Sequence, residues 1–332
     1  MAEPRPDHAL VVESLSVAYP LRGRDATGAR RRLLAVDDVS FAIPRGTTLG
    51  IVGESGSGKT TAAMAAARLV PRSGGRILVD GEDFGSLDEA ALRRARQRVQ
   101  IIFQDPYSSL NPRLRAADIV REPMLYAGRA NRVEQERVID ELFEAVGLRP
   151  EQKSLFPHQF SGGQRQRIGI ARALSTRPSL IICDEPVSAL DVAVQAQILN
   201  LLKSLQTQFG LTYLFISHDL GVVQHMCDEI AVMYMGRFME QADRDSFFTA
   251  PRHPYSRALL DAVPSLEATP SRQMARLVDG AIPDLSKPQQ GCRFASRCPH
   301  AASVCRTTTP PLAPALGVAK PHHLACHLAG EI

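Results

Sequence analysis

The sequence predicts an α/β protein that is followed by a small cysteine-rich second domain. Short apolar runs typical of buried strands alternate with segments of helical periodicity along the first part of the chain. One apolar run leads directly into a glycine-rich turn, Gly53 to Thr60, and then into an Ala-rich segment that favours a helix. Composition changes near Ala250-Pro251, beyond which prolines become frequent and four of the six cysteines occur. We therefore predict domains at 1–250 and 251–332.

Length and composition describe an ordinary globular protein of 332 residues with 44% hydrophobic and 22% charged residues. No apolar run reaches the roughly 18 residues that a spanning helix needs, and the N-terminus has no apolar signal-peptide core. We therefore expect a protein of the cytosol or of the cytosolic face of a membrane.

The net charge is +4. The densest basic cluster, Arg30-Arg31-Arg32, lies in a segment (21–32) that we interpret as a loop. Because no aromatic residues interleave with it, we expect no nucleic-acid partner.

The remaining elements follow from the spacing of apolar residues. Alternating or continuous apolar runs predict strands at 9–17, 36–43, 47–52, 76–79, 99–103, 180–183 and 211–216. Helical periodicity predicts helices at 60–69 and 193–209 and a helical insertion between 112 and 155, within a subdomain of about 105–165. Two short strands, 232–234 and 238–240, suit a hairpin around Gly236.

The segment Gly53-Glu54-Ser55-Gly56-Ser57-Gly58-Lys59-Thr60 is a complete P-loop between a strand and a helix. Its backbone N–H groups are expected to surround the phosphates of a nucleotide at a helix N-terminus, with Thr61 in the same first turn. Lys59 is expected to reach the β- and γ-phosphates, and the Thr60 hydroxyl to ligate Mg²⁺.

Polar residues at the ends of other strands predict the rest of the site. The run 180–183 ends in Asp184-Glu185, where Asp184 would hold Mg²⁺ and Glu185 would polarise the attacking water as general base. His218 follows the buried strand 211–216 and is placed to orient the γ-phosphate. Gln104 ends the run Ile101-Ile-Phe103 and is placed to touch the Mg²⁺ or the water. Tyr19 follows a strand and could stack on adenine, or could equally be a core or surface residue.

A second glycine-rich turn, Ser161-Gly162-Gly163-Gln164, opens another helical segment. One nucleotide needs only one P-loop, so the question is whose phosphates this turn binds.

Taken together, the motifs resemble the ATP-binding subunit of ABC transporters. In the family's order the chain has the P-loop, Gln104, Phe160-Ser-Gly-Gly-Gln164, Asp184-Glu185, Ser188-Ala-Leu-Asp191 and His218. The resemblance covers residues from about 9 to 332. It implies a RecA-like core, an antiparallel β subdomain, a helical subdomain and the small cysteine-rich C-terminal domain.

Three further segments narrow the resemblance to the oligopeptide/dipeptide importer subfamily: Phe103-Gln-Asp-Pro-Tyr-Ser-Ser-Leu-Asn-Pro112, Pro251-Arg-His-Pro-Tyr255 and Gly291-Cys-Arg-Phe-Ala-Ser-Arg-Cys298. The basic segment after Tyr19 resembles the second of the two ATPases that such systems encode. The implied partners are a second ATPase subunit, two transmembrane permease subunits and an extracytoplasmic binding protein, with this chain on the cytoplasmic face of the cell membrane.

In this family each ATP lies between the P-loop of one chain and the signature loop of the other. The resemblance therefore implies that Lys59, Thr60, Gln104, Asp184, Glu185 and His218 serve this chain's own ATP. It implies that Ser161, Gly162, Gly163 and Gln164 serve the partner's ATP, and that Asp191 lies in a loop crossing the interface. Peptides are the expected cargo, with nickel chelates or glutathione as alternatives. The rival functions are a soluble ABC-type ATPase acting on DNA or ribosomes and a nucleotide-gated scaffold.

The C-terminal cysteines Cys292, Cys298, Cys305 and Cys326 are spaced C-x5-C-x6-C-x20-C. In the cytosol, metal binding is a better interpretation than disulfides. Zinc sites usually show tighter Cys pairs, and four thiolates also suit a 4Fe–4S cluster. An iron–sulfur cluster is what the resemblance implies, with zinc and free structural cysteines as the alternatives. Cys183 and Cys227 lie in apolar settings and are expected to be buried thiols.

Overall fold

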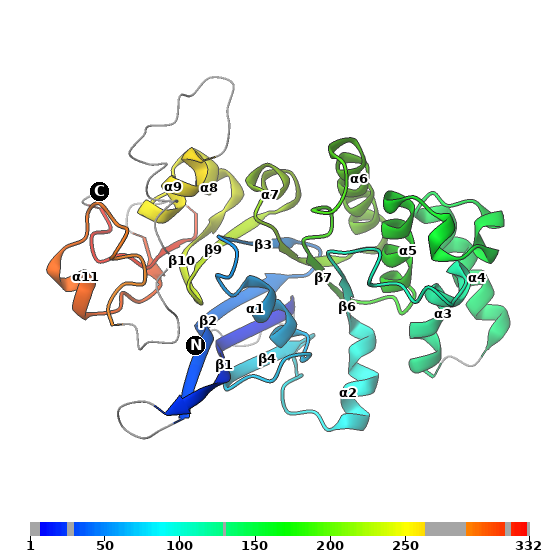
Figure 1. Ribbon diagram of the computed structural model, residues 1–332, viewed down its shortest axis with the longest axis horizontal. Coiled ribbons are helices and arrows are strands. Elements are labelled where there is room, and N and C mark those ends of the chain that lie inside the picture. Colours follow the sequence, from blue (N-terminus) through cyan, green and yellow to red (C-terminus); the bar gives the residue numbers. More distant parts are fainter. Residues whose placement is uncertain (1–6, 25–29, 129–130, 263–289, 316–319, 331–332) are drawn as a thin grey trace. The chain divides into compact units, whose positions relative to one another are not determined.

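The computed structural model describes residues 7–24, 30–128, 131–262, 290–315 and 320–330 (Figure 1). The chain divides into two compact units, one of residues 1–11, 42–48 and 77–216 and the other of residues 12–41, 49–76 and 217–332. Four strands contribute residues to both units: β1 (His8–Arg24), β2 (Arg30–Pro44), β3 (Thr48–Val52) and β4 (Gly74–Val79).

Three parallel strands form the centre of the first unit, in the order β6 (Val99–Ile102), β7 (Leu180–Asp184) and β8 (Thr212–Ile216). Every residue of β7 and β8 is buried. That burial explains why these strands appear as continuous apolar runs in the sequence, as parallel strands covered on both faces do. Asp184 pairs in register with Ile216, so β7 and β8 end at the same edge.

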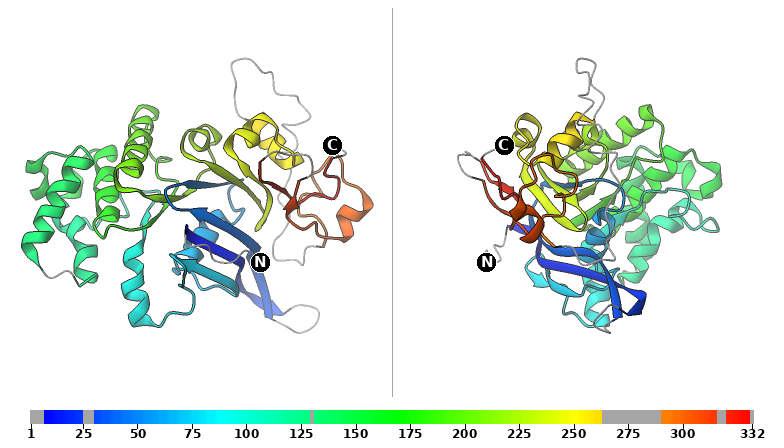
Figure 2. Two further views of the ribbon diagram at one scale, coloured as in Figure 1. Left: turned by 180° about the vertical axis from the view of Figure 1, so that it is seen from behind. Right: turned by 60° about the vertical axis from the view of Figure 1, so that its left-hand side comes forward.

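Helices supply the rest of the first unit. They are α2 (Glu89–Ala95), α3 (Ala116–Tyr126), α4 (Arg132–Ala145), α5 (Gly162–Leu174) and α6 (Val192–Phe209), with 3₁₀ turns at Arg96–Arg98, Pro150–Ser154 and Pro157–Gln159 and a short strand, β5 (Glu82–Asp83). Helices α3, α4 and α5 contact one another (Figure 2). Helix α4 begins at Asn131, whose side chain accepts the N–H groups of Val133 and Glu134 and caps the first turn.

In the second unit, five strands lie in the order β11 (Ala313–Pro314), β12 (His322–Leu324), β10 (Arg237–Asp243), β9 (Glu229–Tyr234) and β3. Strand β3 is parallel to β9, and the others pair antiparallel. The expected hairpin between β9 and β10 is confirmed. Its two turn residues, Met235 and Gly236, have φ angles of 46° and 82°, which matches the twist that a two-residue hairpin needs.

The helices of the second unit are α1 (Lys59–Ala66), α7 (Leu220–Met226), α8 (Arg244–Thr249), α9 (Pro254–Asp261) and α11 (Ser303–Thr307). Helices α8 and α9 contact β10. Three aromatic side chains, Tyr234, Tyr255 and Phe294, are buried together with ring centroids 4.7 to 5.4 Å apart. They come from β9, from α9 and from the segment after residue 290, so they join the C-terminal part of the chain to the sheet.

The prediction of a loop over 21–32 was wrong at both ends. Strand β1 continues to Arg24 and β2 begins at Arg30, and 25–29 lie outside the described residues. Charged side chains and a glycine hid the alternation there, but main-chain pairing does not require apolar side chains. Within the described residues, no helix has both the length and the apolar character needed to cross a bilayer.

Candidate nucleotide-binding site

The P-loop follows β3 and takes its shape from glycines that no other residue could replace without strain. Gly53 and Gly58 have φ angles of 151° and 104°. A Cβ on Gly53 would lie 2.1 Å from the carbonyl oxygen of Met233, and one on Gly58 would lie 2.3 Å from that of Ala35. The loop backbone is therefore in direct contact with its neighbours, and glycine is required at both positions.

Lys59 is 5% exposed, and its Nζ donates to the carbonyl oxygens of Gly53 and Glu54 at 2.8 Å each. The ammonium group of Lys59 thus lies against the P-loop backbone, where phosphate oxygens can replace the carbonyl oxygens of Gly53 and Glu54 as its hydrogen-bond acceptors. The Oγ of Ser57 is buried without a hydrogen-bond partner among the described residues, which leaves a donor for a ligand. Thr60 is exposed in the first turn of α1, where Mg²⁺ would be reached.

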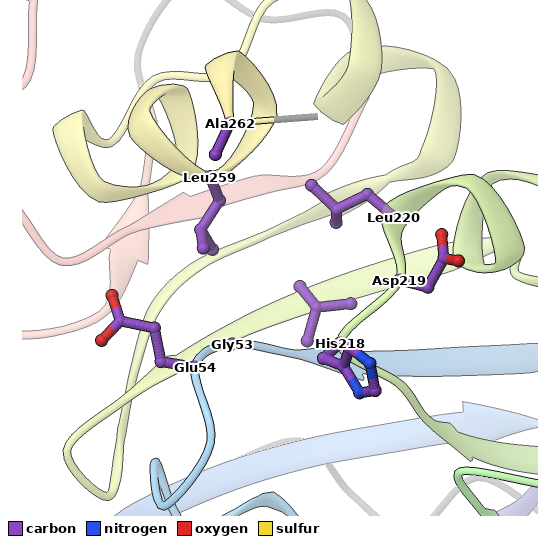
Figure 3. A pocket seen from close by; sticks show the side chains of 8 residues that line it. Gly53, Glu54, His218, Asp219, Leu220, Leu259 and Ala262 are labelled. Atoms are coloured by element: carbon purple, nitrogen blue, oxygen red, sulfur yellow. The ribbon is translucent and has the colours of Figure 1, made fainter. Parts of the chain in front are cut away.

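A pocket of about 400 Å³ adjoins the P-loop. Gly53 and Glu54 line it together with His218 and Asp219, which precede α7, and Figure 3 shows Leu259 of α9 pointing toward the P-loop. His218 is exposed, so its imidazole is accessible to a ligand on this side of the loop. The sequence predicted His218 beside the phosphates, and the structure places it beside Gly53.

Asp184 ends β7 in the first unit, and Glu185 follows it. Asp184 is 7% exposed. Glu185 has a φ of 47°, a left-handed conformation that is costly for a residue with a Cβ and that occurs at functional sites. Its N–H donates to the carbonyl oxygen of Ile216 at 3.0 Å, which fixes this turn to the end of β8. Gln104 Nε2 donates to Glu185 Oε2 at 3.1 Å, so two of the predicted catalytic side chains are in contact.

The second glycine-rich turn begins α5. Ser161 Oγ accepts the N–H of Gln164 at 3.3 Å, and Gln164 Oε1 accepts the N–H of Ser161 at 3.0 Å, which forms a capping box. Ser161 is exposed. The helix therefore presents a capped N-terminus with a hydroxyl at the surface, an arrangement suited to an anion supplied from outside this chain.

Helix α5 also ties this turn to the rest of the first unit. Gln166 Nε2 donates to the carbonyl oxygen of Pro186, just after Glu185, at 2.8 Å, and Arg172 Nη1 donates to that of Ser109 at 2.6 Å. Asp191 is exposed at the N-cap position of α6. The helix thus connects the signature turn with the turn after β7 and with the segment after Gln104. Tyr19 lies on β1 and is 36% exposed.

The expected metal site at the C-terminal cysteines is not supported. All four of these cysteines are described and are free, yet the described residues contain no group of three or more His, Cys, Asp or Glu side chains that could hold a metal ion. Burial raises the pKa of Cys292 to about 11 and also raises the pKa values of Cys298 and Cys326. Cys183 and Cys227 are buried, as predicted.

Sequence reasoning missed a set of contacts that fix Glu54 of the P-loop. Arg297 forms two 3.0 Å contacts with its carboxylate, and the Tyr255 hydroxyl accepts its N–H at 3.0 Å. Arg297 is 243 residues away in the chain, so no spacing rule could pair the two. The available signal was that Tyr255 and Arg297 both fall within the segments that mark the importer subfamily.

Two family models match the chain. Residues 36–188 match the ABC transporter family, and residues 239–305 match the family described as oligopeptide/dipeptide transporter, C-terminal region. The first match includes the P-loop, Gln104, the Ser161 turn and Glu185. The second includes Tyr255 and Arg297.

Curated relatives resemble the chain over most of its length. A probable peptide ABC transporter ATP-binding protein of Sinorhizobium fredii, y4tS, is 47% identical over 97% of this chain and 90% of its own. The oligopeptide transport ATP-binding protein AppF of Bacillus subtilis is 48% identical over 89% of each. Among solved structures, a dimeric post-hydrolysis state of the ATP-binding cassette MJ0796, bound to ADP and Pi, matches with a TM-score of 0.62 and 27% identity over 71% of this chain and 98% of that one.

Proposed function

The chain belongs to the family of ABC transporter ATP-binding proteins, and we propose that it hydrolyses ATP to power the import of di- or oligopeptides. The contact between Gln104 and Glu185 carries the hydrolytic part of the proposal, because it joins a general base to a side chain that can orient water. The peptide cargo is supported by the match of residues 239–305 and by the names of the relatives.

Each predicted residue has a place in the proposed reaction. Lys59, the P-loop N–H groups and Ser57 Oγ hold the phosphates, while Thr60 and Asp184 hold Mg²⁺. Glu185 takes a proton from the attacking water. His218 orients the γ-phosphate, and Gln104 touches the Mg²⁺ or the water. Ser161 to Gln164 bind the ATP of a partner chain, and Asp191 lies at that interface. The exposed, capped start of α5 supports the proposal that the Ser161 turn binds the ATP of a partner chain, as does the dimeric state of the MJ0796 cassette.

We propose the following assembly: this chain with a second ATPase subunit, two permease subunits and an extracytoplasmic binding protein, on the cytoplasmic face of the cell membrane. ATP bridges the two ATPases, and loss of the γ-phosphate weakens the bridge. The resulting motion would pass to the permeases through the helical subdomain of about 105–165. Arg172 of α5, bonded to Ser109 after Gln104, supports that route.

Residues 251–332 are proposed to form the C-terminal domain, as the composition change predicts. The finer proposal that its four cysteines hold a 4Fe–4S cluster, or zinc, rests on their spacing and on the family resemblance, and the geometry does not support it. Iron and sulfide analysis of anaerobically purified protein tests the cluster. Stoichiometric iron with sulfide supports it, and a colourless protein with stoichiometric zinc contradicts it.

Uptake of labelled peptides by cells that lack this gene tests the transport function. We expect uptake to be lost and then restored by the wild-type chain but not by Glu185→Gln. Labelled nickel chelates and glutathione serve as parallel cargoes. Unchanged peptide uptake in the deletion strain, with loss of uptake of one of the other cargoes, would contradict peptide import while leaving the ATPase assignment intact.

A further inference from the structure

Glu54 of the P-loop contacts four other residues. Its N–H donates to the Tyr255 hydroxyl at 3.0 Å, and its carboxylate faces the two terminal nitrogens of Arg297 at 3.0 Å each. Its carbonyl oxygen accepts from Lys59 Nζ at 2.8 Å and from the N–H of Ser57 at 3.2 Å. The same residue therefore joins the phosphate-binding lysine to two side chains from the C-terminal part of the chain.

The contact with Arg297 is a buried pair. The Arg297 side chain is 5% exposed and that of Glu54 is 16% exposed. Arg297 Nη1 also donates to the hydroxyl of Tyr234 at 3.1 Å, and its guanidinium lies 5.7 Å from the ring centre of Phe294. One hydrogen bond, from Nη1 to Glu54 Oε2, and one ion-pair contact, from Nη2 to Oε1, orient the carboxylate, and the aromatic neighbours leave the guanidinium little freedom to move.

The charge of Glu54 explains why such a pair is needed. A carboxylate within a phosphate-binding loop repels the phosphates of ATP unless a cation neutralises it. Arg297 supplies that cation from the side of the C-terminal segment. Burial raises the pKa of Tyr255, so its hydroxyl stays neutral and keeps the Glu54 N–H in place.

We propose that Arg297 and Tyr255 are positioning residues that hold Glu54 and so keep the P-loop competent for ATP, which makes nucleotide affinity depend on the C-terminal domain. This inference rests on the proposed function, in which the P-loop binds ATP. Coupling of this kind is reciprocal. ATP bound at the loop stabilises the contacts of Tyr255 and Arg297 in return.

The test measures the Kd of the full chain for Mg·ATP with a fluorescent nucleotide. Arg297→Gln is expected to raise Kd about tenfold, a change of roughly 1.4 kcal/mol. Adding Glu54→Gln in the same chain is expected to recover most of the affinity, because it removes the uncompensated charge. Arg297→Lys is expected to be intermediate, since an ammonium group cannot make the two-point contact. A purely structural role for Arg297 would give no recovery in the double variant.

Arg293→Gln is the matched control. Arg293 lies four positions away, is 8% exposed and pairs with Asp37, whose exposure is also 16%, outside the P-loop. We expect its Kd to match that of the wild type. If Arg297→Gln fails to fold, Tyr255→Phe decides the matter, because it removes only the hydroxyl that accepts the Glu54 N–H and should raise Kd several-fold.

Three results would overturn the inference: wild-type affinity in Arg297→Gln and Tyr255→Phe, an equal loss in Arg293→Gln, or no recovery in the double variant. Lys59→Ala separates this failure from failure of the proposed function. If Lys59→Ala loses ATP while the Arg297 and Tyr255 variants bind normally, only the inference fails. If Lys59→Ala binds ATP as the wild type does, the nucleotide site itself is wrong.

Discussion

Glu185 adopts a left-handed backbone conformation, with a φ of 47°, at the end of a fully buried strand. The conformation costs roughly 1–2 kcal/mol for a residue with a Cβ. The N–H bond to Ile216 holds the turn in this form, and the hydrogen bond from Gln104 orients the carboxylate. Strained backbone conformations of this kind occur at functional sites, where the direction of the side chain matters for the chemistry.

Removing the Gln104 amide should therefore affect turnover rather than binding. We expect Gln104→Ala to lower the rate of ATP hydrolysis about tenfold, less than the roughly 10²–10⁴-fold that a general base itself contributes, while the Kd for ATP stays unchanged. Steady-state phosphate release and nucleotide binding measure the two quantities. Gln100→Ala is the control, because Gln100 lies on β6 and its side chain bonds to the carbonyl oxygen of Arg96. Equal rates in Gln104→Ala and the wild type would refute the positioning role.

At the scale of elements, α5 depends on a close approach to α6. A Cβ on Gly163 would lie 2.6 Å from Cγ1 of Val194, so a larger residue here requires Val194 to shift. The contact fixes the signature turn against the helix that follows Asp191.

We expect Gly163→Ala to lower the free energy of unfolding by about 1–3 kcal/mol, as overpacked contacts do. Val194→Ala in the same chain removes the offending methyl groups and should restore most of that stability. Urea unfolding measures both variants. A Gly163→Ala protein as stable as the wild type would show that the two helices can separate freely.

How far the sequence predicts each element depends on burial. Strands β7 and β8 are wholly buried, so their apolar runs were visible, and α6 was predicted within one residue. The ends of β1 and β2 were missed because polar side chains occupy them. Strands β11 and β12 have two and three residues, which is too short for any periodicity, and their pairing with distant β10 decides their conformation.

Across the whole molecule, a buried polar cluster ties the end of the chain to β10. Glu240 is 0% exposed and accepts from the N–H groups of Arg252 and His253 and from His322 Nε2. His253 is also buried, and its Nδ1 accepts the N–H of Tyr255. Burial lowers the pKa of His253 to about 4, against the opposing effect of the Glu240 charge and with a smaller lowering by Arg257.

His253 should make stability depend on pH. Its folded pKa lies below the unfolded value near 6.5, so protons bind the unfolded chain more readily. Its contribution, on the order of 3 kcal/mol, is complete above pH 6.5 and is lost as pH falls toward 4. Urea unfolding at pH 7.5 and 5 measures the loss, and His253→Gln should show a smaller pH dependence. The same slope in the variant and in the wild type would contradict this account.

The nucleotide residues stay predictions, which the sequence allows because each group lies in one short motif next to a strand or helix end. The contacts of Glu54 were not, since Arg297 approaches from 243 residues away through a fold that the motifs do not specify. Charge pairs of this kind depend on tertiary structure alone. Local motifs therefore predict the chemistry of the site, while the contacts between the P-loop and the C-terminal part of the chain require the folded chain.

We propose that this chain hydrolyses ATP with Glu185 as the base. The most direct measurement is phosphate release by the transporter complex, purified through a tag on this chain, with wild-type and Glu185→Gln subunits. We expect the variant to keep bound ATP and to release phosphate at least about a hundredfold more slowly. Hydrolysis at the wild-type rate in Glu185→Gln would contradict the account.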